Sequence, residues 1–234
     1  RWDRQSVTRG NTVRADQVVP FEGFAAAAMG IANAKSLRAT NLWRQVGAVI
    51  ARVGILKHRR REPDEYFQAL VEEIISQQLS GRVVDVITGR FVNLFQTRRF
   101  PEPVEILARS DNELRSSGMS FSKAAYIKNI ARSVHEGALA LRKLDSLPDE
   151  DVIAQLTAVK GIGRWTAEMF LMFSLGREDV FSAGDLGLKN AIMRLYGLRK
   201  QPDRNKLEKI ARAWQPYRTL ACLYLWASVD LPWE

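Results

Sequence analysis

The sequence predicts an all-α protein of about ten helices. Apolar residues recur at steps of three and four along most of the chain, which places them on one face of a helix. No stretch of useful length alternates apolar and polar residues, as a half-buried strand would. With 234 residues, 46% of them hydrophobic, the chain can bury a core as one large domain or two small packed ones.

The basic residues are concentrated near the N-terminus. Residues 1–63 hold twelve Lys and Arg against four Asp and Glu, whereas residues 64–234 hold twenty-three against twenty-two. Residues 1–36 are weakly patterned and predict a loosely structured basic arm before a helical domain over 37–234. The basic run 57–61 either forms a solvated loop or adds salt-sensitive affinity for a polyanion such as nucleic acid.

Apolar stripes and residues that typically begin helices place the elements in order. Ser110 and Glu113 form a capping box, and Asp185 and Asp203 stand where helices begin. Pro216 suits the first turn of the last helix. The expected helices are 42–53, 67–79, 81–94, 111–118, 127–137, 149–157, 164–175, 185–197, 203–214 and one beginning near Pro216.

Several classes of protein are excluded by composition. The single cysteine, Cys222, rules out an internal disulfide, a four-cysteine iron–sulfur cluster and a zinc knuckle. Two histidines, His58 and His135, are too few for a histidine-rich metal site. No apolar run approaches the ~20 residues that span a bilayer. We therefore expect an intracellular monomer with no membrane partner.

The segment over 149–175 predicts a helical hairpin around Gly161-Ile-Gly163. The two glycines allow a tight turn, and their amides, next to the start of a helix, form a site for an anion. Lys160 and Arg164 add positive charge on either side. The flanking apolar residues favour a packed hairpin that binds phosphate over a plain helix–helix connection, which remains the alternative.

Five segments carry a resemblance to a known family, the last of them Leu-Tyr-Leu-Trp over 223–226. Residues 156–167 read Leu-x-x-Val-x-Gly-Ile-Gly-Arg-Trp-Thr-Ala, and 179–187 read Asp-Val-Phe-x-x-x-Asp-Leu-Gly. With Ile-Ile-Ser-Gln-Gln-Leu-Ser over 74–80 and Trp-Gln-Pro-Tyr-Arg over 214–218, the chain resembles the helix-hairpin-helix DNA glycosylases. Within them it resembles the alkylpurine (3-methyladenine) glycosylases. The resemblance covers about residues 42–232.

The resemblance implies a fold, a partner and a catalyst. Two packed helical subdomains would hold the active site in the cleft between them, and duplex DNA with damaged purines would be the partner. Asp185 matches the catalytic carboxylate, although Asp in this place is by itself a common helix cap. Gly184 replaces the second aspartate that the family often has. Trp165 stands where bifunctional relatives carry a nucleophilic lysine, so water would be the nucleophile and an abasic site the product.

The resemblance also implies a base pocket and further DNA contacts. Trp165 and Trp226 match aromatic residues that line the pocket, and Met169 could shape it, although all three also suit a core. Gln78, or else Leu79, matches the side chain that fills the gap left by a flipped nucleotide. A further contact with phosphate or support of the pocket is implied for Arg218.

A monovalent cation, Na⁺ or K⁺, is a further implication. The backbone carbonyls that match its ligands belong to Thr157, Val159 and Gly161. Two other functions stay open: a non-catalytic DNA-binding protein in which Asp185 is only a cap, and a glycosylase of the same fold with another base preference. The single cysteine argues against the iron–sulfur branches, and Trp165 against the strand-cleaving ones.

Overall fold

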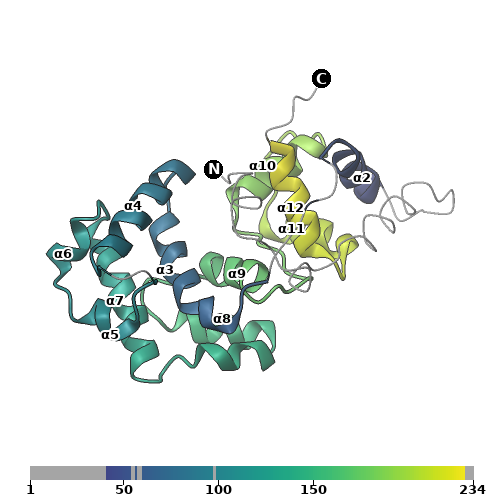
Figure 1. Ribbon diagram of the computed structural model, residues 1–234. Coiled ribbons are helices and arrows are strands. Elements are labelled where there is room, and N and C mark those ends of the chain that lie inside the picture. Colours follow the sequence, from purple (N-terminus) through teal and green to yellow (C-terminus); the bar gives the residue numbers. More distant parts are fainter. Residues whose placement is uncertain (1–40, 54–55, 57–59, 97–98, 230–234) are drawn as a thin grey trace. The chain divides into compact units, whose positions relative to one another are not determined.

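The computed structural model confirms the all-α prediction (Figure 1). All regular structure in the part of the chain that it describes is helical, with eleven α-helices and three 3-10 helices. The described residues are 41–53, 56, 60–96 and 99–229. The expected N-terminal arm over 1–36 lies outside them, as do Lys57, His58 and Arg59 of the basic run.

The chain divides into two compact units, in agreement with the two expected helical subdomains. The first unit spans Arg61–Leu175, and the second combines helix α2 (Asn41–Val53) with the described chain from Gly176 onward. No described helix has both the length and the apolar character that a membrane span requires. The expected position of the active site between the subdomains stays a prediction.

The first unit is built around α3, α7 and α9. The hydroxyl of Tyr66 on α3 donates to Asp145 at 2.9 Å, and its ring meets Phe170 of α9 edge-on at 5.4 Å between centroids. In chain order the unit contains η3 (Pro63–Glu65), α3 (Tyr66–Ser76), α4 (Gly81–Asn93), α5 (Pro103–Leu107), α6 (Asp111–Arg115), α7 (Phe121–His135), η4 (Leu141–Ser146), α8 (Asp149–Thr157) and α9 (Arg164–Phe173).

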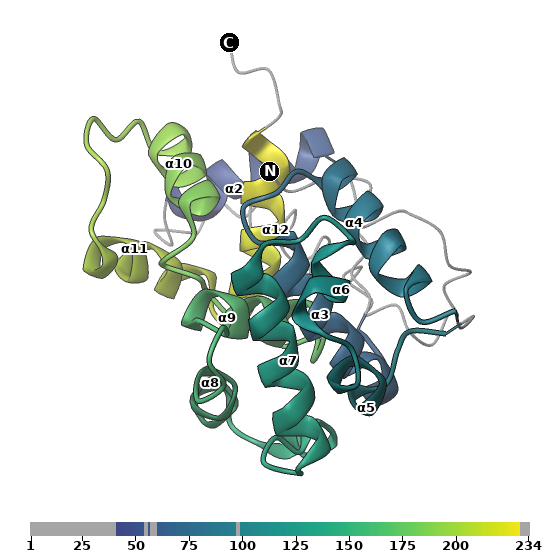
Figure 2. The ribbon, with the colours of Figure 1, turned by 90° about the vertical axis from the view of Figure 1, so that its left-hand side faces the viewer.

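The second unit is organised around the apolar helix α12 (Arg218–Val229), which is buried over residues 219–228. It packs against α10 (Leu186–Leu195) and α2, as Figures 1 and 2 show. Helix α11 (Arg204–Ala211) and η5 (Arg212–Trp214) complete the unit. A helix that is apolar on all sides is suited to this central position.

The predicted caps are confirmed. Asp203 accepts the Lys206 amide at 2.7 Å and begins α11. Ser110 and Glu113 form the reciprocal capping box of α6, which holds the pKa of Glu113 down at about 2 through hydrogen bonds from Ser110. The sequence also carried a signal for the unpredicted helix α5, since Glu102 and Glu105 form a second capping box around a proline at its first position.

Several predicted helix boundaries were wrong: α7 begins at Phe121 rather than 127, and α6 ends at Arg115 rather than 118. The apolar stripe of α3 extends to Leu79, but the helix ends at Ser76 because Gln77 turns to a ψ of 122°. Leu79 is consequently half-buried in a turn rather than on the helix.

Pro216 was also misplaced, since it precedes the last helix instead of lying in its first turn. The Tyr217 amide bonds back to the Trp214 carbonyl at 2.8 Å, which closes a turn over Pro216. Helix α12 therefore begins at Arg218.

Candidate active site

The hairpin of α8 and α9 turns where the glycines predict. Gly161 has a φ of +114°, and a Cβ there would lie 2.4 Å from Cγ of Tyr126 on α7. Only glycine satisfies both the backbone conformation and this close approach. Gly163 caps α9 with ordinary dihedrals and has open space where a Cβ would be, so its backbone is accessible to a ligand.

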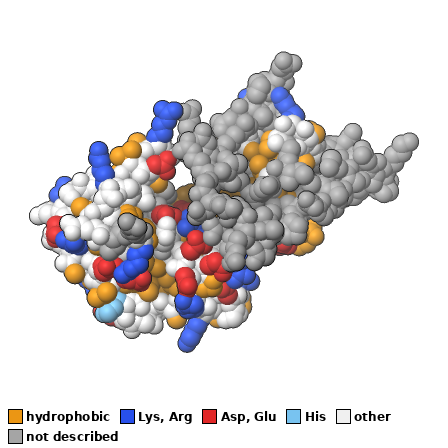
Figure 3. Space-filling model, in the orientation of Figure 1, with side chains coloured by type: hydrophobic (Ala, Val, Ile, Leu, Met, Phe, Trp, Pro, Cys, Tyr) orange, Lys and Arg blue, Asp and Glu red, His pale blue; other side chains and the backbone are white. Residues whose placement is uncertain are grey.

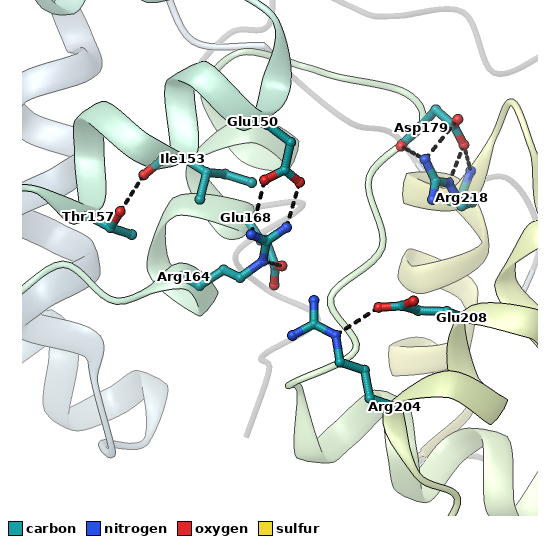
Figure 4. Close-up of polar contacts among 9 residues, drawn as sticks. All are labelled: Glu150, Ile153, Thr157, Arg164, Glu168, Asp179, Arg204, Glu208 and Arg218. Carbon is teal, nitrogen blue, oxygen red and sulfur yellow. Dashed lines mark hydrogen bonds and ion pairs between the residues drawn. The ribbon is translucent and has the colours of Figure 1, made fainter.

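The two basic residues of the hairpin differ in their surroundings. Lys160 is exposed, and its carbonyl accepts Nδ2 of Asn129 at 3.1 Å. Arg164 instead donates to both carboxylate oxygens of Glu150, at 2.6 and 3.1 Å, and to Glu168 at 2.9 Å (Figure 4). The hydrogen bonds that Arg164 donates to Glu150 raise the pKa of Arg164 further. Arg164 thus ties α8 to α9, while the Lys160 side chain projects from the hairpin.

Charge over the first unit is mixed. Figure 3 shows Lys and Arg side chains interspersed with Asp and Glu on the visible face. This agrees with the near balance of twenty-three basic and twenty-two acidic residues over 64–234. Any phosphate binding by the hairpin therefore depends on its own amides and Lys160 more than on a broad basic surface.

Asp185 occupies the N-terminus of α10, where its Oδ1 accepts two hydrogen bonds. One comes from the Leu188 amide at 2.7 Å and the other from Nε1 of Trp226 on α12 at 2.9 Å. The carboxylate is half-buried and held at the positive end of the helix dipole. Asp185 is therefore a helix cap and, at the same time, a carboxylate fixed from two directions.

Gly187 makes room for this arrangement. A Cβ at Gly187 would lie 3.1 Å from Oδ1 of Asp185 and 3.2 Å from Cδ1 of Trp226. Such contacts are shorter than ordinary van der Waals separations, so glycine allows the carboxylate and the indole to meet. Gly187 could not be identified from the sequence, because its φ is unexceptional and only the three-dimensional contact distinguishes it.

The three candidate pocket residues are exposed to different degrees. Trp165, in the first turn of α9, has 37% of its surface exposed, which excludes the core interpretation for it. Met169, one helical turn later, is 4% exposed, and Trp226 is 7% exposed. Trp226 serves as a donor to Asp185, and its role and that of Met169 in a base pocket stay predictions.

Arg218 is engaged within its own unit. Its guanidinium binds both oxygens of Asp179, at 2.6 and 3.0 Å, and the Asp179 carbonyl at 2.7 Å (Figure 4). A bidentate pair of this kind fixes the loop before α10 against the start of α12. Of the two roles implied for Arg218, support of the site fits this geometry better than contact with phosphate.

Residues 76–79 form a type II turn between α3 and α4, named here the α3–α4 turn. The Leu79 amide bonds to the Ser76 carbonyl at 3.0 Å. Gln77 has φ −48° and ψ 122°, and Gln78 has a φ of +60°. The Gln78 side chain is exposed at this turn, as a residue inserted into DNA requires.

Comparison with known proteins identifies the class of protein. The model of the HhH-GPD superfamily, described as base excision DNA repair proteins, matches residues 71–216. This match covers the α3–α4 turn, the hairpin and Asp185. The chain belongs to the HhH-GPD superfamily of base excision DNA repair proteins.

Two curated relatives have similar sequences. The chain is 35% identical over 169 residues to the putative DNA-3-methyladenine glycosylase YfjP of Bacillus subtilis, covering 70% of this chain and 59% of the relative. It is 35% identical over 175 residues to DNA-3-methyladenine glycosylase 1 of Schizosaccharomyces pombe, covering 74% of this chain and 77% of the relative. The chain thus matches less than two thirds of the Bacillus protein.

Two solved structures are similar in both fold and sequence. The S. pombe 3-methyladenine DNA glycosylase Mag1 in complex with abasic DNA gives a TM-score of 0.76 at 32% identity, with 88% of this chain and 97% of that chain covered. A DNA-3-methyladenine glycosidase from Bacillus halodurans gives 0.66 at 37% identity, with 80% and 89% covered.

Proposed function

We propose that this chain is a monofunctional DNA glycosylase that releases alkylated purines, of the 3-methyladenine and 7-methylguanine type, from duplex DNA. The relatives named 3-methyladenine glycosylases support the substrate class, and the similar structure bound to abasic DNA supports the partner. The reaction begins base excision repair, so the protein acts inside the cell in association with DNA.

The position of Asp185 carries the proposal. Breaking the glycosidic bond develops positive charge on the sugar, and a carboxylate held beforehand at the correct place stabilises that charge without reorganising. The Leu188 amide and the Trp226 indole hold one oxygen of Asp185 in this way. The carboxylate also orients the attacking water, which leaves an abasic site after the base departs.

We assign the base pocket to Trp165 and Met169 on α9, next to the hairpin. Trp165 offers an accessible indole face beside the hairpin, and Met169 follows it on α9. A methylated purine carries positive charge, and an indole face attracts such a cation by about 0.5–2 kcal/mol. This preference explains how alkylated purines would be distinguished from ordinary ones.

The chemistry is hydrolytic rather than lyase chemistry. Trp165 occupies the position in which bifunctional relatives carry an amine, so this position offers no group for a Schiff base. The nearby Lys160 has its backbone held by Asn129 on the other side of the turn. We assign its ammonium to a phosphate, together with the Arg164 amide that follows Gly163 at the start of α9.

The hairpin turn is compatible with a monovalent cation at the carbonyls of Thr157, Val159 and Gly161. The Val159 carbonyl accepts the Ile162 amide at 3.0 Å, and its second lone pair can still bind a cation. The Thr157 hydroxyl is turned back to the Ile153 carbonyl at 2.7 Å, so only the backbone of Thr157 is offered (Figure 4). Such a cation would reinforce the attraction of the turn for phosphate.

The test is release of free base from methylated duplex DNA, with the products separated by chromatography. Each sample is divided, and half is heated in alkali, which breaks the strand at abasic sites. We expect methylpurines to be released and strand breaks only after alkali. Breaks without alkali would show lyase activity, and binding without release would favour the non-catalytic alternative, in which Asp185 is only a cap.

A further inference from the structure

The last turn of α3 is closed by a lysine from another helix. Nζ of Lys123 on α7 donates to the carbonyl of Ile75 at 2.8 Å and to that of Gln77 at 2.7 Å. The last carbonyls of a helix have no partner within the helix, and a cation at this end is favoured by the helix dipole. Burial lowers the pKa of Lys123, as expected for an ammonium drawn into the protein to reach these carbonyls.

The segment that Lys123 holds contains a backbone conformation that residues other than glycine rarely adopt. Gln78 has a φ of +60°, at the place in a type II turn where glycine is preferred. A residue in the left-handed region costs roughly 1–3 kcal/mol, so this conformation persists only where the surrounding structure enforces it. Besides the two bonds to Lys123, Nε2 of Gln77 donates to the Thr166 hydroxyl of α9 at 3.3 Å. The turn is thus fastened to α7 and to the hairpin helix.

The same helix α7 also holds the hairpin. The ring of Tyr126 packs against Gly161, and Nδ2 of Asn129 donates to the Lys160 carbonyl. Lys123, Tyr126 and Asn129 follow one another at steps of three along α7, which runs beside α3 in Figure 2. One rigid helix therefore contacts both the α3–α4 turn and the phosphate-binding turn of the hairpin.

We propose that Lys123 is a positioning residue, which holds the α3–α4 turn in register with the hairpin so that Gln78 enters duplex DNA while the hairpin binds the phosphate backbone. The inference rests on the proposed function, because it assigns a purpose to Gln78 during base flipping. Filling the gap left by a flipped nucleotide offsets part of the few kcal/mol lost on unstacking. A turn displaced from its register loses that contribution.

The experiment is a double-mutant cycle between Lys123→Met and Gln78→Ala. Methionine keeps the length of the side chain and removes the donors to the two carbonyls. Lys128→Met is the matched control, because Lys128 lies on the same helix and binds Asp111 at 2.7 Å, away from the turn. Lys123→Arg restores a cationic donor. Single-turnover base release, affinity for duplex with a synthetic abasic site, and melting temperature are measured for each variant.

We expect Lys123→Met to slow base release about tenfold, as a displacement of about half an ångström would. Lys128→Met should change the rate less than about twofold, and Lys123→Arg should recover most of the loss. In the Gln78→Ala background the effect of Lys123→Met should shrink to about twofold or less. Equal losses in both backgrounds, or no loss in either, would overturn the proposal.

Affinity for the abasic duplex separates this proposal from the proposed function. If the wild type released no base, the glycosylase assignment would fail, while the coupling between Lys123 and Gln78 in abasic-duplex affinity would still support the positioning role. If base were released but neither rate nor affinity showed coupling, the positioning role would fail alone. Should Lys123→Met melt below the assay temperature, the same cycle is measured at a lower temperature at which all four proteins are folded, and the coupling between Lys123 and Gln78 decides the matter.

Discussion

Substituting Gly187 by alanine tests whether the position of the Asp185 carboxylate limits the reaction. The added methyl would lie 3.1 Å from Oδ1 of Asp185 and 3.3 Å from Nε1 of Trp226. Ordinary carbon–heteroatom contacts lie near 3.4–4 Å, so the carboxylate or the indole must move by about 0.3–0.5 Å. This movement would disturb the hydrogen bond from Nε1 of Trp226 to Oδ1 of Asp185.

The magnitude follows from the sensitivity of catalysis to distance. A misplacement of 1 Å costs about 100-fold in rate, so a shift of 0.3–0.5 Å costs roughly 4- to 10-fold. Alanine is at the same time a better helix former than glycine, by up to about 1 kcal/mol in a helix interior. We therefore expect Gly187→Ala to lower the rate while its melting temperature stays the same or rises slightly.

The assay is single-turnover release of methylpurine, accompanied by thermal melting. Gly89→Ala is the matched control, because Gly89 lies within α4 and has nothing within 4 Å of where its Cβ would be. It should raise the melting temperature and leave the rate unchanged. An unaltered rate for Gly187→Ala would contradict this prediction, because it would mean that the reaction tolerates displacement of the carboxylate.

Three further predictions concern the first unit. Lys160→Ala should reduce the salt dependence of DNA affinity by about one phosphate contact. Arg164→Met should leave the salt dependence unchanged and lower the melting temperature, because Arg164 is bound by two carboxylates. Burial raises the pKa of Glu73 from 4.5 to about 7. The free energy of unfolding should therefore fall as pH rises between these values, by up to about 3 kcal/mol. Glu73→Gln should abolish this pH dependence in denaturant titrations. Gly161→Ala should destabilise the hairpin by several kcal/mol in the same titrations, since its methyl would overlap Tyr126.

Much of the fold could be predicted because the signals were local. The caps at Ser110, Asp185 and Asp203 depend on residues within three positions of each other, and the structure has all three. The end of α3 could not be predicted, because the apolar stripe continues to Leu79 although the backbone turns at Gln77. Periodicity reports which residues are apolar and does not detect a change in backbone dihedrals.

The residues of the candidate site could be predicted from the sequence, but the contacts between them could not. Asp185, Gly161 and Trp165 follow from the motif, whereas the bond from Trp226 to Asp185 joins residues 41 positions apart. Lys123 likewise reaches the α3–α4 turn from another helix, 46 positions along the chain from Gln77. Such pairs are set by tertiary packing, which a single sequence does not reveal.

The ion pair between Arg164 and Glu168 could have been predicted from the sequence. Arg164 and Glu168 stand four positions apart on α9, a spacing at which opposite charges meet on a helix. With this pair in view, Arg164 is better described as part of the hairpin's own structure than as a free contact for phosphate. Both Arg164 and Lys160 are exposed, and Lys160 is the one that we assign to a phosphate.

The most direct test of the account compares base release by the wild type and by Asp185→Asn. An asparagine oxygen can accept the same bonds from the Leu188 amide and the Trp226 indole, and asparagine is as good a helix cap as aspartate. The substitution therefore removes the charge and keeps the structure. The account predicts a loss of at least about 100-fold in the rate of methylpurine release, with melting temperature and affinity for DNA nearly unchanged. A variant that releases base as fast as the wild type would contradict it, and Asp185 would be a helix cap alone.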